Sequence, residues 1–142
     1  MQYVSEILDD VAKASDDDEK LRILRSAKCY ELLPILKNIV DPNVKWHFNE
    51  IPSFKRLDGP PELGYIHLGE ALRRSYLFNV GNPKAPAGLT MSKRTELLTQ
   101  ILEALSGGEA DIYCNMILKK LPRGLPKKVA KEFTQLWAYS AF

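Results

Sequence analysis

The chain has 142 residues, of which 45% are hydrophobic and 27% charged, with a net charge of +2. This length and balance predict one globular domain over residues 1–142, long enough to bury a core. No apolar run reaches membrane-spanning length, and the N-terminus lacks a basic region before an apolar one. We therefore expect a cytoplasmic protein in which Cys29 and Cys114 are reduced thiols rather than a disulfide.

The charge is unevenly distributed along the chain. Residues 1–19 carry seven acidic side chains and one basic side chain, a balance of −6. The remaining 123 residues carry 19 basic and 11 acidic side chains, a balance of +8. Most of the chain is therefore basic although its total charge is near neutral. His47 and His67 are too far apart in sequence to suggest a metal site, and no cofactor is predicted.

Apolar residues recur at helical spacing through the first 40 residues. A second helix is expected to begin at a cap formed by Ser15 or Asp16. The acids at 16–19 suit the first turn of that helix, and they lack the further ligands and the glycine of a calcium loop. Pro34 lies near the beginning of a third helix. The predicted inward faces are Val4, Ile7, Leu8 and Val11; Leu21, Leu24 and Ala27; and Leu32, Leu36, Ile39 and Val40.

A fourth helix is predicted between Asp41-Pro42 and Pro52. Asp41 is a suitable N-cap, Pro42 suits the first helical position, and Pro52 ends the segment. Trp46 falls on the face opposite the apolar one, so we expect it to contact another element or a ligand. The apolar face consists of Val44, His47, Phe48 and Ile51.

The rest of the chain continues the helical pattern. Residues 53–64 are expected to form a loop because of their Gly and Pro content. Helices are then predicted from about residue 66 to 79, from a cap at Ser92 to Gly107-Gly108, from about 110 to 121, and onward from Pro126. No segment alternates with a period of two. The sequence therefore predicts an all-α domain of seven to eight short helices.

The segment KKLPRGLPKKVAK, residues 119–131, has six positive charges and no acidic residue. It is expected to contain a helix end, a turn with a glycine, and a helix start. Such a turn presents backbone N–H groups and the positive end of a helix dipole to an anion. A solvated basic turn is the alternative, but unopposed charge favours phosphate binding without base readout. The candidate residues are Lys119, Lys120, Arg123, Gly124, Lys127, Lys128 and Lys131.

Two stretches carry a resemblance to a known family. The first, ILRSAKCYELLPILKNIVDPNVKWHFNEIP, contains the pair Leu32-Leu33, a turn before Val44-Lys45-Trp46, and a terminal Ile-Pro. The second, ILKKLPRGLPKKVAKEF, has a leucine, a glycine three residues later and a short basic helix. Both resemble the N-terminal helical DNA-binding domain of ATP-dependent DNA ligases from tailed phages.

The resemblance implies a ligase DNA-binding-domain-like fold, a phage origin, and contact with the backbone and minor groove of duplex DNA. It implicates Arg123, Gly124, Lys127, Lys128 and Lys131. We expect a protein without the adenylation domain, and in KRLDG (residues 55–59) Arg56 stands where the K-x-D-G motif has its lysine. A guanidinium that stays protonated cannot be that nucleophile.

Two functions are consistent with these observations. The first is a non-enzymatic DNA-binding protein with little sequence preference. The second is an adaptor or inhibitor that acts on replication or transcription machinery, which the acidic residues 1–19 favour because they would repel DNA.

The last ten residues contain four aromatics and no charged side chain. Either the final helix continues and packs Phe133, Leu136 and Trp137 inward, or Tyr139 to Phe142 form a docking peptide. The candidate partner-binding residues are Trp137, Tyr139 and Phe142.

Overall fold

The computed structural model describes the backbone of residues 3–140 and the side chains of residues 3–135. Over this range the chain forms helices and two isolated bridges but no strand, which confirms the all-α prediction. No described helix is long and apolar enough to cross a membrane. The elements are α1 (Val4–Lys13), α2 (Asp17–Ser26), α3 (Leu32–Val40), the 3-10 helix η1 (Pro61–Leu63), α4 (Leu68–Arg73), the 3-10 helix η2 (Ser75–Leu77), α5 (Met91–Ala104), α6 (Gly107–Leu118) and α7 (Lys127–Ser140).

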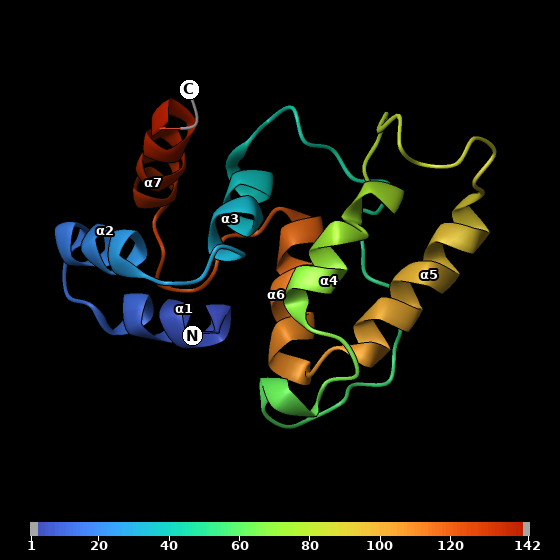
Figure 1. The fold of residues 1–142 in the computed structure, drawn as a ribbon, viewed down its shortest axis with the longest axis horizontal. Coiled ribbons are helices and arrows are strands. Elements are labelled where there is room, and N and C mark those ends of the chain that lie inside the picture. The colour runs from blue at the N-terminus through green and yellow to red at the C-terminus, as the bar shows by residue number, and fades with distance from the viewer. Residues whose placement is uncertain (1–2, 141–142) are drawn as a thin grey trace.

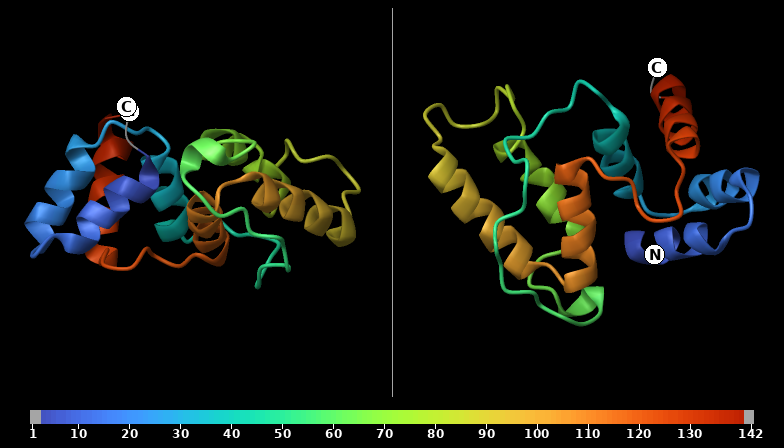
Figure 2. Two further views of the ribbon diagram at one scale, coloured as in Figure 1. Left: turned by 90° about the horizontal axis from the view of Figure 1, so that it is seen from below. Right: turned by 180° about the vertical axis from the view of Figure 1, so that it is seen from behind.

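The helices form two groups that meet along α3 and α6 (Figures 1 and 2). On one side α1 packs on α2, and α7 packs on both α2 and α3. On the other side α4 and α5 pack on α6. One cluster of buried apolar residues runs through both groups, and the predicted inward face of α1 belongs to it, with no member more than 8% exposed. The last helix of the chain thus lies against the second and third.

The sequence predicts the N-cap of α2 correctly, whereas the predicted N-cap of α5 lies two residues too late. Asp16 caps α2, because its carboxylate accepts the backbone N–H of Glu19 at 2.8 Å. At α5 the cap is Thr90 rather than Ser92, since the Thr90 hydroxyl accepts the N–H of Lys93 at 3.1 Å. Both caps satisfy an N–H that the first helical turn leaves without a partner.

The predicted helix between residues 42 and 51 is wrong, because the backbone there pairs with a distant segment. The N–H of His47 donates to the carbonyl of Phe78 at 2.9 Å, and the N–H of Val80 donates to that of Lys45 at 2.8 Å. Trp46 and Asn79 form an antiparallel bridge within this pairing. The local signals compete as well, since the Asp41 carboxylate accepts the N–H of Asn43 at 2.9 Å, a turn geometry.

The same pairing shortens the helix predicted over residues 66–79. The α-helix α4 ends at Arg73, and the chain tightens into η2. There the Ser75 hydroxyl donates to the carbonyl of Leu72 at 2.7 Å. Phe78 then turns inward and contacts Phe48 edge-on, with ring centroids 5.9 Å apart. Its pairing with the segment around His47 replaces further helical hydrogen bonds.

The Gly107-Gly108 pair begins α6 instead of ending α5. Leu105 is already extended, with ψ 150°, so α5 stops before the glycines. The N–H of Gly107 donates to the carbonyl of Leu57 at 2.6 Å. A Cβ at Gly107 would lie 2.8 Å from Nε of Arg56. A larger residue here would have to displace the flexible Arg56 side chain, so the glycine leaves room for that side chain against α6.

Candidate nucleic-acid interface

The basic segment 119–131 consists of the connection between α6 and α7, residues 119–126, and the first residues of α7 (Figures 1 and 2). The helix α6 ends at Leu118, and Lys119 adopts the left-handed conformation with φ 57°. The N–H of Lys120 then donates to the carbonyl of Asn115 at 2.8 Å, which satisfies one of the last carbonyls of the helix. The predicted order of helix end, glycine turn and helix start is confirmed.

Gly124 holds this connection against the first two helices. It has φ 83°, and a Cβ there would lie 2.8 Å from the Cα of Ala12 in α1. Its carbonyl accepts a hydrogen bond from Nζ of Lys20 in α2 at 2.6 Å. Only glycine combines the left-handed backbone with such a close approach to a neighbouring main chain. Gly124 therefore fixes the place of the turn.

The ammonium group of Lys119 forms hydrogen bonds within the protein. Its Nζ donates to the carbonyl of Asp41 and, at 2.7 Å, to that of Val44. Burial lowers the pKa of Lys119, because desolvation disfavours the ammonium, while the charge of Asp41 acts in the opposite direction. The side chain thus attaches the irregular 41–44 segment to the end of α6, and two of its three N–H donors point at carbonyls.

The other five predicted cations are exposed. Two of them, Lys120 and Arg123, lie on the connection, and three lie on α7. A helix places residues 127, 128 and 131 on one side, opposite the buried Val129 and Ala130. Among the residues whose side chains are described, no acid forms an ion pair with any of the five. The exposed cations are Lys120, Arg123, Lys127, Lys128 and Lys131.

The start of α7 carries the opposite charge from the start of α2. Its first turn holds Lys127 and Lys128 and no acid. By contrast, the first turn of α2 holds Asp17, Asp18 and Glu19. Positive side chains at the positive end of a helix dipole oppose folding, whereas acids there favour it. An anion bound at the start of α7 would interact favourably with both the lysines and the helix dipole.

The acidic residues of α2 lie close to this basic turn. Lys20 bonds to Gly124, and its own N–H donates to the carbonyl of Asp16, one helical turn earlier. Both charge blocks are visible in the sequence, but their adjacency depends on the contact of α2 with α7. An approaching polyanion therefore meets cations on α7 and carboxylates at the start of α2.

Other residues considered from the sequence have structural partners. Nε of Arg56 donates to Asp58 and Nη2 donates to Asp111, both at 2.9 Å, so this guanidinium ties the 53–60 loop to α6. Trp46 is half-buried in the bridge to residue 79. Cys29 and Cys114 are free thiols, as predicted. In the described part of the chain no three His, Cys, Asp or Glu residues could together hold a metal ion.

The aromatic candidates near the C-terminus are only partly described. The backbone of α7 is helical as far as Ser140, so the final helix does continue past Phe133. The side chains of Trp137 and Tyr139 and all of Phe142 lie outside the described residues.

The chain matches no protein-family model, no curated protein and no solved structure. The similarity to the ligase DNA-binding domain stays a prediction from the sequence.

Proposed function

We propose that the chain is a non-enzymatic DNA-binding protein that contacts the phosphate backbone of duplex DNA. The observation that carries the proposal is the start of α7, where Lys127 and Lys128 are exposed and no acid shares the turn. Lys131 extends the same side of the helix, and Lys120 and Arg123 precede it on the connection. Five cations without ion-pair partners among the described side chains are a surface suited to a chain of phosphates.

The chemistry of this surface is electrostatic. Ammonium groups and first-turn N–H groups bind phosphate oxygens but do not distinguish bases, so we expect little sequence preference. The resemblance to the ligase domain supports the same surface and adds minor-groove contact and a phage origin to the proposal. Lys119 and Gly124 contribute indirectly, because their contacts hold the connection in place.

The acidic turn of α2 limits how DNA can lie on this surface. Carboxylates next to Lys20 repel phosphates, so the duplex should cross α7 on the side away from the start of α2. Screening acts over about 8 Å at physiological salt, which makes this repulsion a local effect. The α2 acids therefore restrict the orientation of DNA and weaken its binding.

The test is a titration of a fluorescent duplex of about 20 base pairs at several salt concentrations, with anisotropy as the readout. The variant Lys127→Ala/Lys128→Ala/Lys131→Ala should bind more weakly, and its salt slope should fall by roughly 0.9 for each phosphate that the protein no longer neutralises. The matched control Lys55→Ala/Lys84→Ala/Lys93→Ala removes three exposed lysines elsewhere and should change affinity much less. Equal losses of affinity in both variants, or no binding by the unaltered protein, would refute the proposal.

A further inference from the structure

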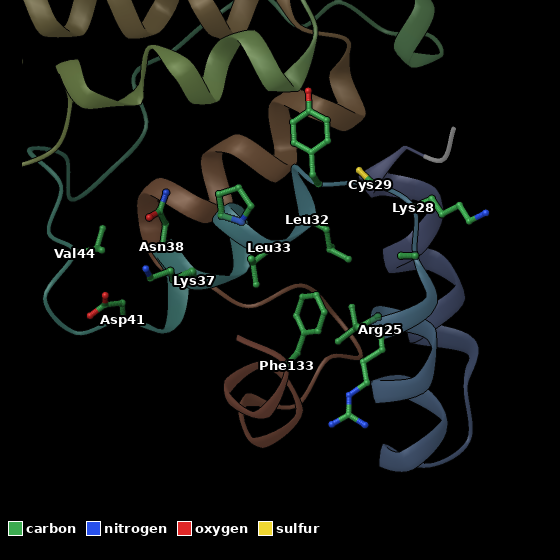
Figure 3. Close-up of a pocket in the computed structure, with 14 residues that line it drawn as sticks. Arg25, Lys28, Cys29, Leu32, Leu33, Lys37, Asn38, Asp41, Val44 and Phe133 are labelled. Atoms are coloured by element: carbon green, nitrogen blue, oxygen red, sulfur yellow. The ribbon is translucent and has the colours of Figure 1, made fainter. Parts of the chain in front are cut away.

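A groove with a volume of about 890 Å³ lies between α2, the connection 27–31, α3 and α7 (Figure 3). This is the size of cavities that hold several side chains or a small ligand. Figure 3 shows Phe133 of α7 pointing into it, with Leu32 and Leu33 of α3 on the opposite wall. The apolar lining is formed by Leu24, Ala27, Leu32, Leu33, Pro34, Val44 and Phe133.

The rim of the groove is positively charged on both sides. Arg25 of α2 and Lys37 of α3 are exposed and lie on opposite sides of Phe133 (Figure 3). Neither has an ion-pair partner among the side chains that the structure describes, and Lys28 adds a third positive charge to the rim. Asp41 is the acid in the lining, and its carboxylate already accepts the N–H of Asn43.

An aromatic side chain also lines the groove. Tyr30 is 76% exposed, so its ring is accessible to a ligand of the groove. Exposed tyrosines beside apolar pockets frequently contribute much of the energy of protein–protein binding, since they offer a large rigid surface with one polar end. The groove therefore combines an apolar interior, an aromatic at its edge and cations on two sides.

We propose that this groove binds an acidic amphipathic segment of a partner protein, with apolar side chains inserted between α3 and α7. Acidic residues on both flanks of that segment would pair with Arg25 and Lys37. Arg25 and Lys37 lie apart, so an amphiphile with a single acidic head could pair with only one of them. This separation favours a peptide with several acidic side chains. The proposal gives the chain a protein-interaction role that does not depend on DNA binding.

The groove and the basic surface occupy different sides of α7. Phe133 faces the groove, whereas Lys127, Lys128 and Lys131 lie on the opposite, exposed arc of the helix. A partner in the groove would therefore leave these lysines accessible, and the two activities can be separated by mutation.

The experiment measures binding of a fluorescent peptide of about 15 residues with Leu and Phe at helical spacing and Glu on its other face. The full chain should bind this peptide, and should bind neither a scrambled peptide nor one with Lys in place of Glu. Arg25→Glu/Lys37→Glu should weaken binding at least about tenfold. Lys55→Glu/Lys84→Glu makes the same change in net charge at exposed sites outside the groove and should leave affinity within about twofold. Thermal unfolding of each variant checks that it is folded.

Three results would overturn the proposal. One is that the full chain does not bind the peptide, whatever the reason, including occupation of the groove by its own residues 136–142. Another is an equal loss of affinity in the two charge-reversal variants. The third is dodecanoate binding as tightly as the peptide with the same dependence on Arg25 and Lys37. The triple lysine variant of α7 should retain peptide binding while losing DNA affinity, which separates the two proposals.

Discussion

Gly124→Ala should be among the most destabilising single-methyl changes that the described chain offers. The residue has φ 83°, and an alanine forced into the left-handed region costs roughly 1–2 kcal/mol. The added Cβ would lie 2.8 Å from the Cα of Ala12, a backbone atom that cannot rotate away. Overpacking of this kind costs roughly 1–3 kcal/mol. We expect a total loss of about 2–5 kcal/mol, or about 6–15 °C in melting temperature for a chain of this size.

Gly88→Ala is the matched control for this prediction. Gly88 has φ 79°, almost the same backbone conformation, but no atom lies within 4 Å of the position that its Cβ would take. It should therefore show the conformational cost alone, about 1–2 kcal/mol. Urea unfolding followed by circular dichroism measures both variants. If the two losses of stability agree within about 0.5 kcal/mol, the contact between the turn and α1 does not constrain the fold as described.

Two further changes test the electrostatics. Asp17→Asn/Asp18→Asn should tighten duplex binding at low salt, because it removes carboxylates beside the basic turn; unchanged or weaker binding in the anisotropy titration would contradict the assigned arrangement. Glu109 is buried, with one carboxylate oxygen lacking a described partner, and burial raises its pKa above the ordinary 4.5. The unfolded chain then loses this proton first, so stability should fall as the pH rises from 4.5 through the folded-state pKa. Glu109→Gln should flatten that part of the curve of unfolding free energy against pH.

The elements that the sequence predicts correctly are those whose signals are local. The apolar stripe of α1 and the Asp16 cap of α2 depend on residues a few positions apart, and both have the predicted roles. The helix predicted over residues 42–51 is wrong because helical spacing of apolar side chains coincides there with backbone pairing to residues 78–80. Periodicity describes which side chains are apolar, but it cannot show that a distant segment offers the same backbone groups a different partner.

In the candidate site, too, the features set by nearby residues are predictable and those set by distant contacts are not. The alternation of exposed Lys127 and Lys128 with buried Val129 and Ala130 follows from helical geometry and could be predicted. The position of Lys119 could not, because its two acceptors lie 75 and 78 residues earlier in the chain. The nearness of the acidic α2 turn to Gly124 likewise depends on a hydrogen bond across 104 residues.

The packing of α7 against α2 and α3 has a consequence for synthesis of the protein. Residues 17–40 leave the ribosome roughly 100 residues before α7 does, which at about 5–20 residues per second is a delay of about 5–20 s. During that interval the apolar faces of α2 and α3 lack the helix that covers them, and a nascent chain in this state is exposed to chaperones and to aggregation. Completion of the N-terminal half of the core therefore waits for the emergence of α7.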